Sequence, residues 1–453
     1  MTNVFNPKIW PSTTTEESGV ISVGGCALTS LAREFGTPAF ILDEADFKMR
    51  ATQWKSALDK HFGDNAGTAY YAAKAFISKE IAHWVEQSGL GLDVCTGGEL
   101  AVAKAANFPA ERIELHGNNK SEQEIFDAID YRVGTIVVDS LQEIERVAKI
   151  AHKMGVVQKV LLRLTPGVDS HTHEAISTAH EDVKFGFSIA SGAAWDAVLA
   201  TTKHDSLSLH GFHAHIGSQI FVSDAFETSA ARLIEMLAKY KAQFGVVLPE
   251  LDLGGGYGIA YIDSDEPSDA NQIMEKLSKT VTAECGKNDL KVPKISIEPG
   301  RAIVGPAMIT IYEVGTTKEV VLEDGSKRWY VSVDGGMSDN LRTALYDAEY
   351  SIDLVNRTST APLRMARVVG KHCETGDIVI NDVQLPSDIV PGDLLATPAT
   401  GAYGRSMANN YNHMVRPPVI SVFNQTARTI IRRESYADLL ALEVDEKPRR
   451  ITE

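Results

Sequence analysis

The chain alternates short apolar runs with amphipathic segments between residues 69 and 298. Segments with an apolar residue every three or four positions, such as 76–88 and 224–244, predict helices, and a glycine follows each of these two directly. Eight shorter runs have the length and composition of buried strands. These runs are Ala69–Ala73, Leu90–Val94, Arg112–His116, Thr135–Asp139, Lys159–Leu164, Leu207–His215, Glu250–Leu253 and Lys294–Glu298.

Alternation of eight strands with helices over about 230 residues is typical of a (β/α)8 barrel. A doubly wound open sheet is the competing arrangement, and its dinucleotide-binding fingerprint ends on a glycine. Residues 254–259 read Gly-Gly-Gly-Tyr-Gly-Ile, so Ile259 stands where that last glycine belongs. We therefore expect an α/β fold with a (β/α)8 TIM barrel over residues 40–300.

Beyond Arg301 the chain changes to short alternating or β-branched runs, separated by Gly, Pro, Asn and Asp. Such runs predict a separate all-β domain of the sandwich or barrel-like type. The segment Gly19–Ala27 alternates in the manner of a hairpin around Gly24 and Gly25, and it has no place in the barrel. We expect residues 1–39 and 301–453 to form this second domain together.

Composition and charge exclude several classes of protein. The 453 residues are 44% hydrophobic and 23% charged, which is enough for two full cores, and the net charge of -16 argues against binding to nucleic acid or to anionic membranes. The four cysteines form no CxxC pair, so we expect no disulfide framework and no structural zinc site. With no leader-like segment and no run of about 18 apolar residues, the sequence indicates a cytoplasmic protein.

Polar residues or glycines follow nearly every predicted strand of the barrel. In this fold the chemistry lies at the carboxyl ends of the strands, so we expect these groups to meet at one edge. The groups are Lys74, Asp93 with Cys95, His116–Asn119, Asp139–Ser140, Arg163, His213–Gln219, Gly254–Gly256 and Glu298–Arg301.

Lys74 follows the first strand of the barrel, directly after an apolar run. An amine in a partly apolar setting loses its proton more easily and then attacks a carbonyl carbon. The alternative is a lysine whose stem runs along the strand end and whose ammonium is solvated.

The last two strand ends favour an anion site. Three consecutive glycines, Gly254, Gly255 and Gly256, can bring backbone N–H groups against a phosphate, and Ser218 and Arg301 can add donors. A turn that needs glycine only for its backbone angles is the alternative.

Glu298 ends an apolar strand, where a carboxylate is costly without a cationic partner. A protonated pyridine nitrogen is such a partner.

His213 and His215 alternate with apolar residues, so both imidazoles point to one face of their strand. Zinc is one possible ligand, with His171 and His173 recruited. No third ligand stands at a fixed spacing, and the second pair lies in a loop-like stretch, so we expect no metal site. A histidine stacked on a flat cofactor ring also fits this strand end.

Two segments of the predicted β domain carry candidate groups. Cys373 stands beside Glu374 in a turn, although a buried structural cysteine is the more usual case. Arg342 and Tyr346 are four residues apart, on one face if the segment is helical, and the arginine can grip a carboxylate with two hydrogen bonds. A surface Arg–Tyr pair is the common alternative.

Six segments together resemble the fold-type III pyridoxal-phosphate decarboxylases, in order and over nearly the whole chain. They are Tyr71–Ala75, His215–Gln219 (HIGSQ), Gly254–Gly258 (GGGYG), Glu298–Arg301 (EPGR), Cys373–Asp377 (CETGD) and Gly401–Tyr403 (GAY). The resemblance implies a homodimer that uses pyridoxal 5′-phosphate as its cofactor.

The resemblance also implies a role for each site residue. Lys74 would bind the cofactor covalently, His215 would stack on its ring, and Glu298 would hold the ring nitrogen protonated. Cys373 would protonate the reacting carbon, delivered with Glu374 from the other subunit. The remaining cofactor contacts would be Ser218, Gly254, Gly255, Gly256, Gly300, Arg301 and Tyr403, and the substrate contacts Arg301, Arg342, Tyr346, Glu374 and Tyr403.

The activity implied by the resemblance is decarboxylation of meso-2,6-diaminopimelate to L-lysine and CO2, the last step of lysine biosynthesis. The distal end of this substrate needs charged recognition, which Arg342 and Glu374 can provide. Decarboxylation of arginine, ornithine or carboxynorspermidine is the alternative within the family, and a racemase is less compatible because it needs a second base. A non-catalytic carrier of the cofactor, built on a lone barrel, would lack the domain after Arg301.

Overall fold

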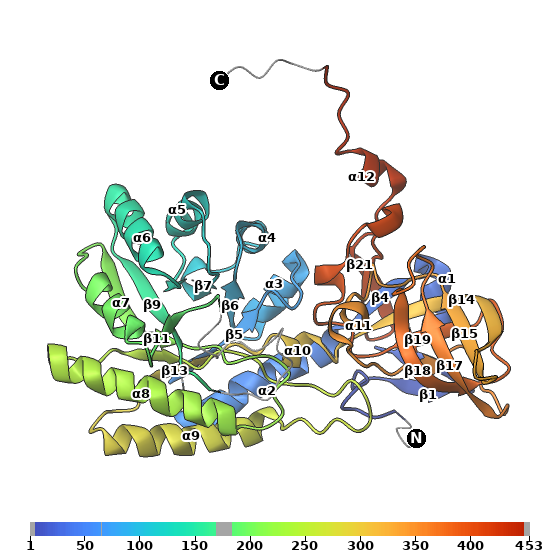
Figure 1. Ribbon diagram of the computed structural model, residues 1–453, viewed down its shortest axis with the longest axis horizontal. Coiled ribbons are helices and arrows are strands. Elements are labelled where there is room, and N and C mark those ends of the chain that lie inside the picture. Colours follow the sequence, from blue (N-terminus) through green and yellow to red (C-terminus); the bar gives the residue numbers. More distant parts are fainter. Residues whose placement is uncertain (1–4, 65, 169–183, 448–453) are drawn as a thin grey trace. The chain divides into compact units, whose positions relative to one another are not determined.

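The computed structural model describes residues 5–64, 66–168 and 184–447. The chain forms two compact units (Figure 1). The first comprises the described residues of Met1–Thr15, Asp43–Ile309 and Pro398–Ser406, and the second those of Glu16–Leu42, Thr310–Thr397 and Met407–Glu453.

The first unit is a closed barrel of parallel strands. Each strand pairs in parallel with the next one around the barrel, and β8 also pairs with β9, so the row closes on itself. The predicted (β/α)8 barrel is thereby confirmed, and each of the eight predicted strands overlaps an observed one. The strands are β5 (Gly67–Ala72), β6 (Gly91–Val94), β7 (Ile113–Leu115), β8 (Thr135–Val138), β9 (Gln158–Thr165), β11 (Leu207–His213), β12 (Glu250–Asp252) and β13 (Lys294–Ile297), with the short β10 (Phe187–Ser188) paired to β9.

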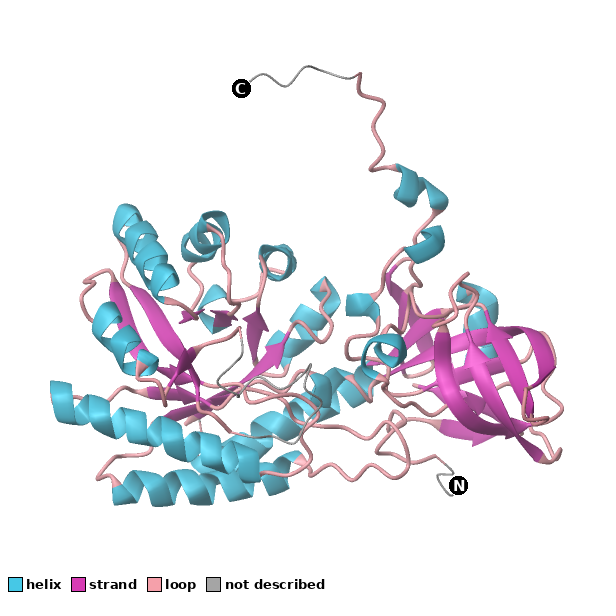
Figure 2. Cartoon of the chain, viewed as in Figure 1, coloured by secondary structure: helices cyan, strands magenta, loops and turns pink. Residues whose placement is uncertain are grey.

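Helices connect the barrel strands and cover the barrel from outside (Figure 2). They are α2 (Glu44–Phe62), α3 (Lys79–Gln87), α4 (Gly97–Ala105), α5 (Glu122–Tyr131), α6 (Leu141–Met154), α7 (Ala193–Thr201), α8 (Asp224–Phe244) and α9 (Ala270–Lys287), with the short α10 (Arg301–Val304) and the 3-10 turn η1 (Ala110–Arg112). None of the described helices is both long enough and apolar enough to cross a membrane.

Capping side chains set where several of these helices begin. The hydroxyl of Ser78 accepts a hydrogen bond from the N–H of Ile81, so α3 begins at Lys79 and not at Phe76 as its apolar period predicts. Helix α8 spans the predicted residues 224–244. Its N-cap is Ser223, whose side chain makes no capping bond.

The second unit is built mainly from strands, as predicted. Its large sheet has the order β18-β17-β15-β14-β4-β20-β21, and β19 pairs with β14 and β16. The strands are β4 (Ala39–Asp43), β14 (Met308–Val321), β15 (Lys327–Val333), β16 (Asp353–Leu354), β17 (Leu363–Val369), β18 (Ile378–Pro386), β19 (Leu394–Thr397), β20 (Val419–Phe423) and β21 (Thr426–Ile431).

The N-terminal segment contributes a small sheet to this second unit. In the predicted hairpin, β2 (Val20–Val23) pairs with β3 (Cys26–Ala27), and β1 (Thr15–Glu17) lies beside β2. Gly24 and Gly25 both have positive φ, which is the reason that this two-residue turn needs glycine. The helix α1 (Leu28–Phe35) follows directly, and the alternation of the hairpin gives no sign of it.

Candidate active site

One pocket of the barrel unit gathers most of the predicted cofactor contacts. Its wall contains eight residues that the sequence singles out, together with Ala72 and Tyr257. The eight are Lys74, His215, Ser218, Gly256, Glu298, Gly300, Arg301 and Tyr403. They come from the carboxyl ends of β5, β11, β12 and β13 and from the segment that ends at Ser406, so the barrel topology brings distant parts of the chain together.

Lys74 lies among carboxylates. Its Nζ atom is 3.8 Å from Oδ2 of Asp93. Burial alone would lower the pKa of this ammonium, but the negative charges of Asp93 and Glu298 outweigh burial and raise the pKa above its usual value. In the chain without a bound ligand, the surrounding carboxylates thus favour the protonated form of Lys74.

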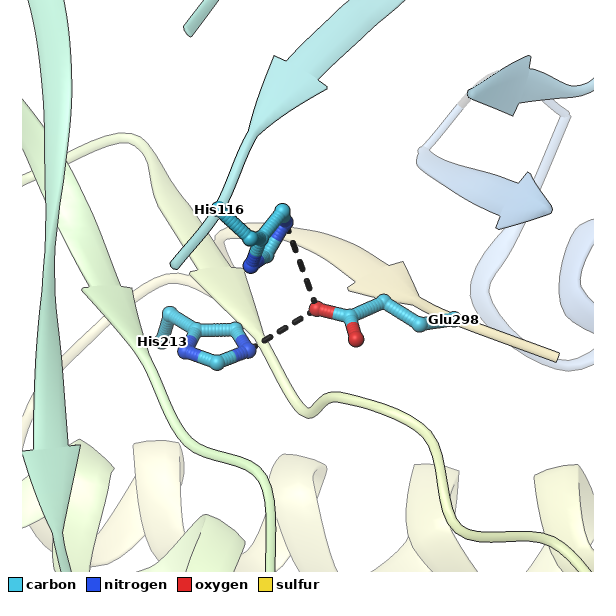
Figure 3. A group of neighbouring side chains, drawn as sticks. All are labelled: His116, His213 and Glu298. Carbon is cyan, nitrogen blue, oxygen red and sulfur yellow. Dashed lines mark ion pairs between the residues drawn. The ribbon is translucent and has the colours of Figure 1, made fainter. Parts of the chain in front are cut away.

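Glu298 is a fully buried carboxylate with histidines around it. Its Oε1 atom is 2.8 Å from Nε2 of His213 and 3.6 Å from Nε2 of His116 (Figure 3). Its Oε2 atom is 3.9 Å from Nδ1 of His215. Burial alone would raise the pKa of this carboxyl, but the histidines and Lys74 outweigh burial and hold the pKa well below its usual range. Glu298 therefore carries a negative charge at neutral pH.

His215 is held in one tautomer. Its Nδ1 accepts a hydrogen bond from the N–H of Gly255 at 3.2 Å, so a proton on the neutral ring lies on Nε2. Burial and the nearby Lys74 ammonium lower the pKa of this imidazole well below its usual value. The pocket therefore contains a neutral imidazole of fixed orientation, as a stacking residue requires.

Arg301 forms the cationic part of the pocket. Its Nη2 donates to the Ser218 hydroxyl at 2.7 Å and its Nη1 donates to the Tyr261 hydroxyl. The guanidinium carbon lies 4.8 Å from the ring centre of Tyr403. The N–H of Tyr403 bonds to the carbonyl of Ala75 at 2.9 Å, which fixes this tyrosine next to the Lys74 segment.

The three glycines after β12 have different positions in the site. The N–H of Gly254 donates to Asp252 at 2.7 Å and that of Gly255 donates to His215, so both amides are already engaged. Gly256 lines the pocket. A Cβ at Gly254 would lie 2.2 Å from the carbonyl oxygen of Ala214, so close approach of two backbones requires glycine there.

The predicted substrate contacts Arg342 and Tyr346 lie in the second unit, at the two ends of the short helix α11 (Arg342–Tyr346). Arg342 is buried, and its Nη1 donates to the Tyr350 hydroxyl at 2.6 Å. Tyr346 is half-buried. The helical geometry assumed for this pair is confirmed, and the arginine is fixed by a neighbouring phenol.

Cys373 and Glu374 lie in an exposed turn of the second unit. The N–H of Cys373 bonds to the Asn412 side chain at 3.1 Å, and the Tyr411 hydroxyl lies 3.5 Å from the Glu374 carboxylate. The alternative of a buried structural cysteine is therefore wrong for Cys373. Its thiol is accessible on the surface of the chain.

Sequence patterns left three buried groups near Glu298 without a role. Asp93 and Arg163 lie within barrel strands, His116 directly follows one, and each is almost fully buried. The only sign of them in the sequence is a polar residue within or directly after an apolar run. Asp334, also without a role, accepts the N–H of Glu313 within the second unit at 2.9 Å.

The described residues contain two groups with the composition of a metal site. One consists of His116, His213 and Glu298, and the other of Glu114, Asp252 and Glu298. His215, half of the histidine pair weighed for zinc, belongs to neither group. His171 and His173 lie outside the described residues.

Comparison with known proteins gives the family. Residues 44–305 match the family described as "Pyridoxal-dependent decarboxylase, pyridoxal binding domain". The chain is 53% identical over 443 residues to a diaminopimelate decarboxylase of Mycobacterium tuberculosis, covering 97% of this chain and 98% of that protein. It is 43% identical over 428 residues to a diaminopimelate decarboxylase of Bacillus subtilis, covering 94% and 96%.

A solved structure shows the same fold. The crystal structure of diaminopimelate decarboxylase from M. jannaschii in complex with L-lysine superposes with a TM-score of 0.89 at 29% identity, and the match covers 96% of this chain and 98% of that one. The likeness thus extends over both units.

Proposed function

The chain belongs to the family of pyridoxal-dependent decarboxylases, and on that basis we propose that it converts meso-diaminopimelate to L-lysine and CO2 with pyridoxal 5′-phosphate as its cofactor. The observation that carries the proposal is the pocket that combines Lys74, Glu298 and Arg301. The names of relatives that match nearly the whole chain support the choice of substrate.

The pocket residues match the three reactive parts of this cofactor. Pyridoxal phosphate presents an aldehyde, a basic ring nitrogen and a phosphate. Lys74 offers an amine, Glu298 offers a buried carboxylate that needs a cationic partner, and Arg301 with Ser218 offers charged and neutral donors. Each part therefore has a complementary group in the pocket.

When bound, the cofactor supplies the electron sink for loss of CO2. The residues of the chain bind, orient and protonate. Lys74 would offer the amine that holds the aldehyde of the cofactor, and Glu298, which stays ionised, would stabilise the protonated ring nitrogen. His215, neutral and fixed by Gly255, would pack against the ring.

The product configuration identifies the carbon that reacts. Because meso-diaminopimelate has one D and one L centre and L-lysine keeps the L centre, the carboxylate that leaves is on the D-configured carbon. The other end of the substrate keeps a carboxylate and an ammonium, which we assign to Arg342 and Glu374. Tyr346, Arg301 and Tyr403 complete the substrate contacts of the proposal.

Protonation after loss of CO2 requires an acid, and we assign this step to Cys373 of a second copy of the chain. The exposure of Cys373 and Glu374 supports the assignment, because an accessible turn can reach a partner. The proposal therefore includes a homodimer with shared active sites. It also includes a cytoplasmic location, since the described cysteines are all free thiols.

A substrate panel tests the proposal. Purified protein with added pyridoxal phosphate is given meso-diaminopimelate, arginine, ornithine, lysine and carboxynorspermidine in parallel, and CO2 release is measured. We expect release from meso-diaminopimelate alone. Release from another amino acid of the panel would keep the chemistry and overturn the substrate, and no release from any of them would overturn the activity.

Replacement of Arg301 by lysine tests the cofactor's anion site. Arg301 donates to Ser218 and Tyr261 from two different nitrogens of a planar group, and a lysine ammonium is a single point charge without this fork, so we expect the Kd for pyridoxal phosphate to rise by about 10-fold. Fluorescence titration of the apo-protein measures the Kd. Arg33→Lys, at an exposed arginine of α1, is the matched control, and an unchanged Kd for Arg301→Lys would remove Arg301 from the site.

A further inference from the structure

The carboxylate of Glu298 has two oxygens in different surroundings. Oε1 lies next to His213 and His116 (Figure 3), whereas Oε2 lies 3.9 Å from the pocket residue His215. Oε1 makes no hydrogen bond within the described chain, so its contacts with the two imidazoles are those of an ion pair. One oxygen therefore faces the two rings in the barrel interior, and the other faces the pocket residue His215.

We propose that His213 and His116 are positioning residues that hold Glu298 through Oε1, so that its charge is available to the ring nitrogen of the cofactor. This inference rests on the proposed function, since it deepens the role of Glu298. Neither histidine lines the pocket. Their effect on the reaction therefore passes through the carboxylate.

Crowding of carboxyl groups is the reason that Glu298 needs such neighbours. Oxygens of Glu114, Asp252 and Glu298 all lie within 4.8 Å of one another, and all three side chains are buried. Burial and mutual repulsion raise the pKa values of Glu114 and Asp252 well above their usual range, whereas the pKa of Glu298 is held below its usual range. His213 faces the one carboxyl of the three that stays ionised and lines the pocket.

The topology explains why only the folded barrel can make this arrangement. His116 follows β7, His213 ends β11 and Glu298 follows β13, and none of these three strands is a neighbour of another. The side chains meet inside the barrel, with the two imidazole rings 5.0 Å apart in an edge-to-face arrangement. Each imidazole thus approaches Oε1 from a different wall.

The two histidines differ in how many carboxylates lie near each of them. His213 is the closer one to Glu298, at 2.8 Å. His116 also lies 3.5 Å from Glu114 and 3.7 Å from Asp93, so its interaction is divided. Burial lowers the pKa values of both imidazoles, and the charge of Glu298 opposes this lowering in each of them. We expect the larger effect from His213.

A double-mutant cycle tests the inference. His213→Gln is made in the native chain and in a Glu298→Gln chain, and two quantities are measured: kcat, and the Kd of the apo-protein for pyridoxal phosphate. We expect His213→Gln to lower kcat and to weaken cofactor binding by about 10-fold each when Glu298 is present, and by less than about 2-fold when it is absent. KM stays within about 2-fold, because the histidine does not contact substrate.

His210→Gln is the matched control. It changes a histidine on the same strand, β11, that forms no ion pair with Glu298 among the described residues, and it should behave as the native chain does. His116→Gln, with a smaller expected effect, repeats the cycle if His213→Gln does not give a folded protein by thermal melting.

The outcomes separate this inference from the proposed function. Equal losses from His213→Gln with and without Glu298 would show a general structural role and overturn the inference. Native kcat and cofactor affinity of His213→Gln, together with an impaired Glu298→Gln, would also overturn the inference. In that case the proposed function would stand. Native behaviour of Glu298→Gln itself would overturn the cofactor role of that carboxylate. Loss of activity on dialysis against a chelator, restored by zinc, would assign the same atoms to a metal ion.

Discussion

Replacement of Lys74 by alanine lowers CO2 release from meso-diaminopimelate by at least about a thousandfold, because the variant lacks the amine that bonds to the cofactor. The side chain ends in the pocket and does not support the core, so the variant should fold. The measurement is the rate of CO2 release at saturating substrate and cofactor, alongside the near-ultraviolet absorbance of the bound cofactor. The absorbance band of the lysine-linked form should be absent.

Lys79→Ala serves as the control for this change. Lys79 is an exposed lysine at the start of α3, only five positions further along the chain. It should release CO2 at the native rate. A Lys74→Ala variant that kept a tenth or more of the native rate would show that another amine does the chemistry.

Replacement of Cys373 by alanine lowers kcat by about 10² to 10⁴-fold, the usual contribution of a positioned general acid. The pocket still binds cofactor and substrate, so the Kd for pyridoxal phosphate stays at its native value. Slow protonation at the wrong atom should give some carbonyl product in place of lysine. Product analysis by mass spectrometry, combined with steady-state kinetics, measures both effects.

A subunit-mixing experiment extends the test to the proposed dimer. Lys74→Ala and Cys373→Ala chains are each nearly inactive, but a mixed dimer with shared sites has one site in which both groups are intact. Mixing equal amounts after reversible dissociation should therefore restore about a quarter of native activity. No recovery, with mixed dimers demonstrated, would place Cys373 and Lys74 of one site in the same chain. Cys26→Ala is the control thiol and should remain active.

The fold was largely readable from the sequence because its signal is periodic and local. Each barrel strand is a short apolar run, and closure of the sheet follows from the number of such runs and the helices between them. Details that depend on single hydrogen bonds were not readable in the same way. The start of α3 is set by the hydroxyl of Ser78, and the helix α1 follows the hairpin without a capping side chain.

The sequence predicts those site residues that stand at the ends of strands. It does not predict contacts between residues of strands that are far apart in the barrel. Lys74, Glu298 and Arg301 stand at strand ends, and they do line one pocket. The convergence of His116 and His213 on Glu298 depends on three strands that are not neighbours, so no spacing in the sequence reveals it. For the same reason, the sequence gives no sign that nearby carboxylates raise the pKa of Lys74.

Decarboxylation in deuterium oxide tests the central claim most directly. Purified protein with pyridoxal phosphate is incubated with meso-diaminopimelate, and CO2 and the amino-acid products are measured together by mass spectrometry and NMR. We predict one CO2 and one L-lysine for each substrate molecule consumed, with a single deuterium on the lysine carbon that carried the lost carboxylate. Deuterium entering diaminopimelate without release of CO2 would show racemisation and would contradict the account, as would an absence of lysine.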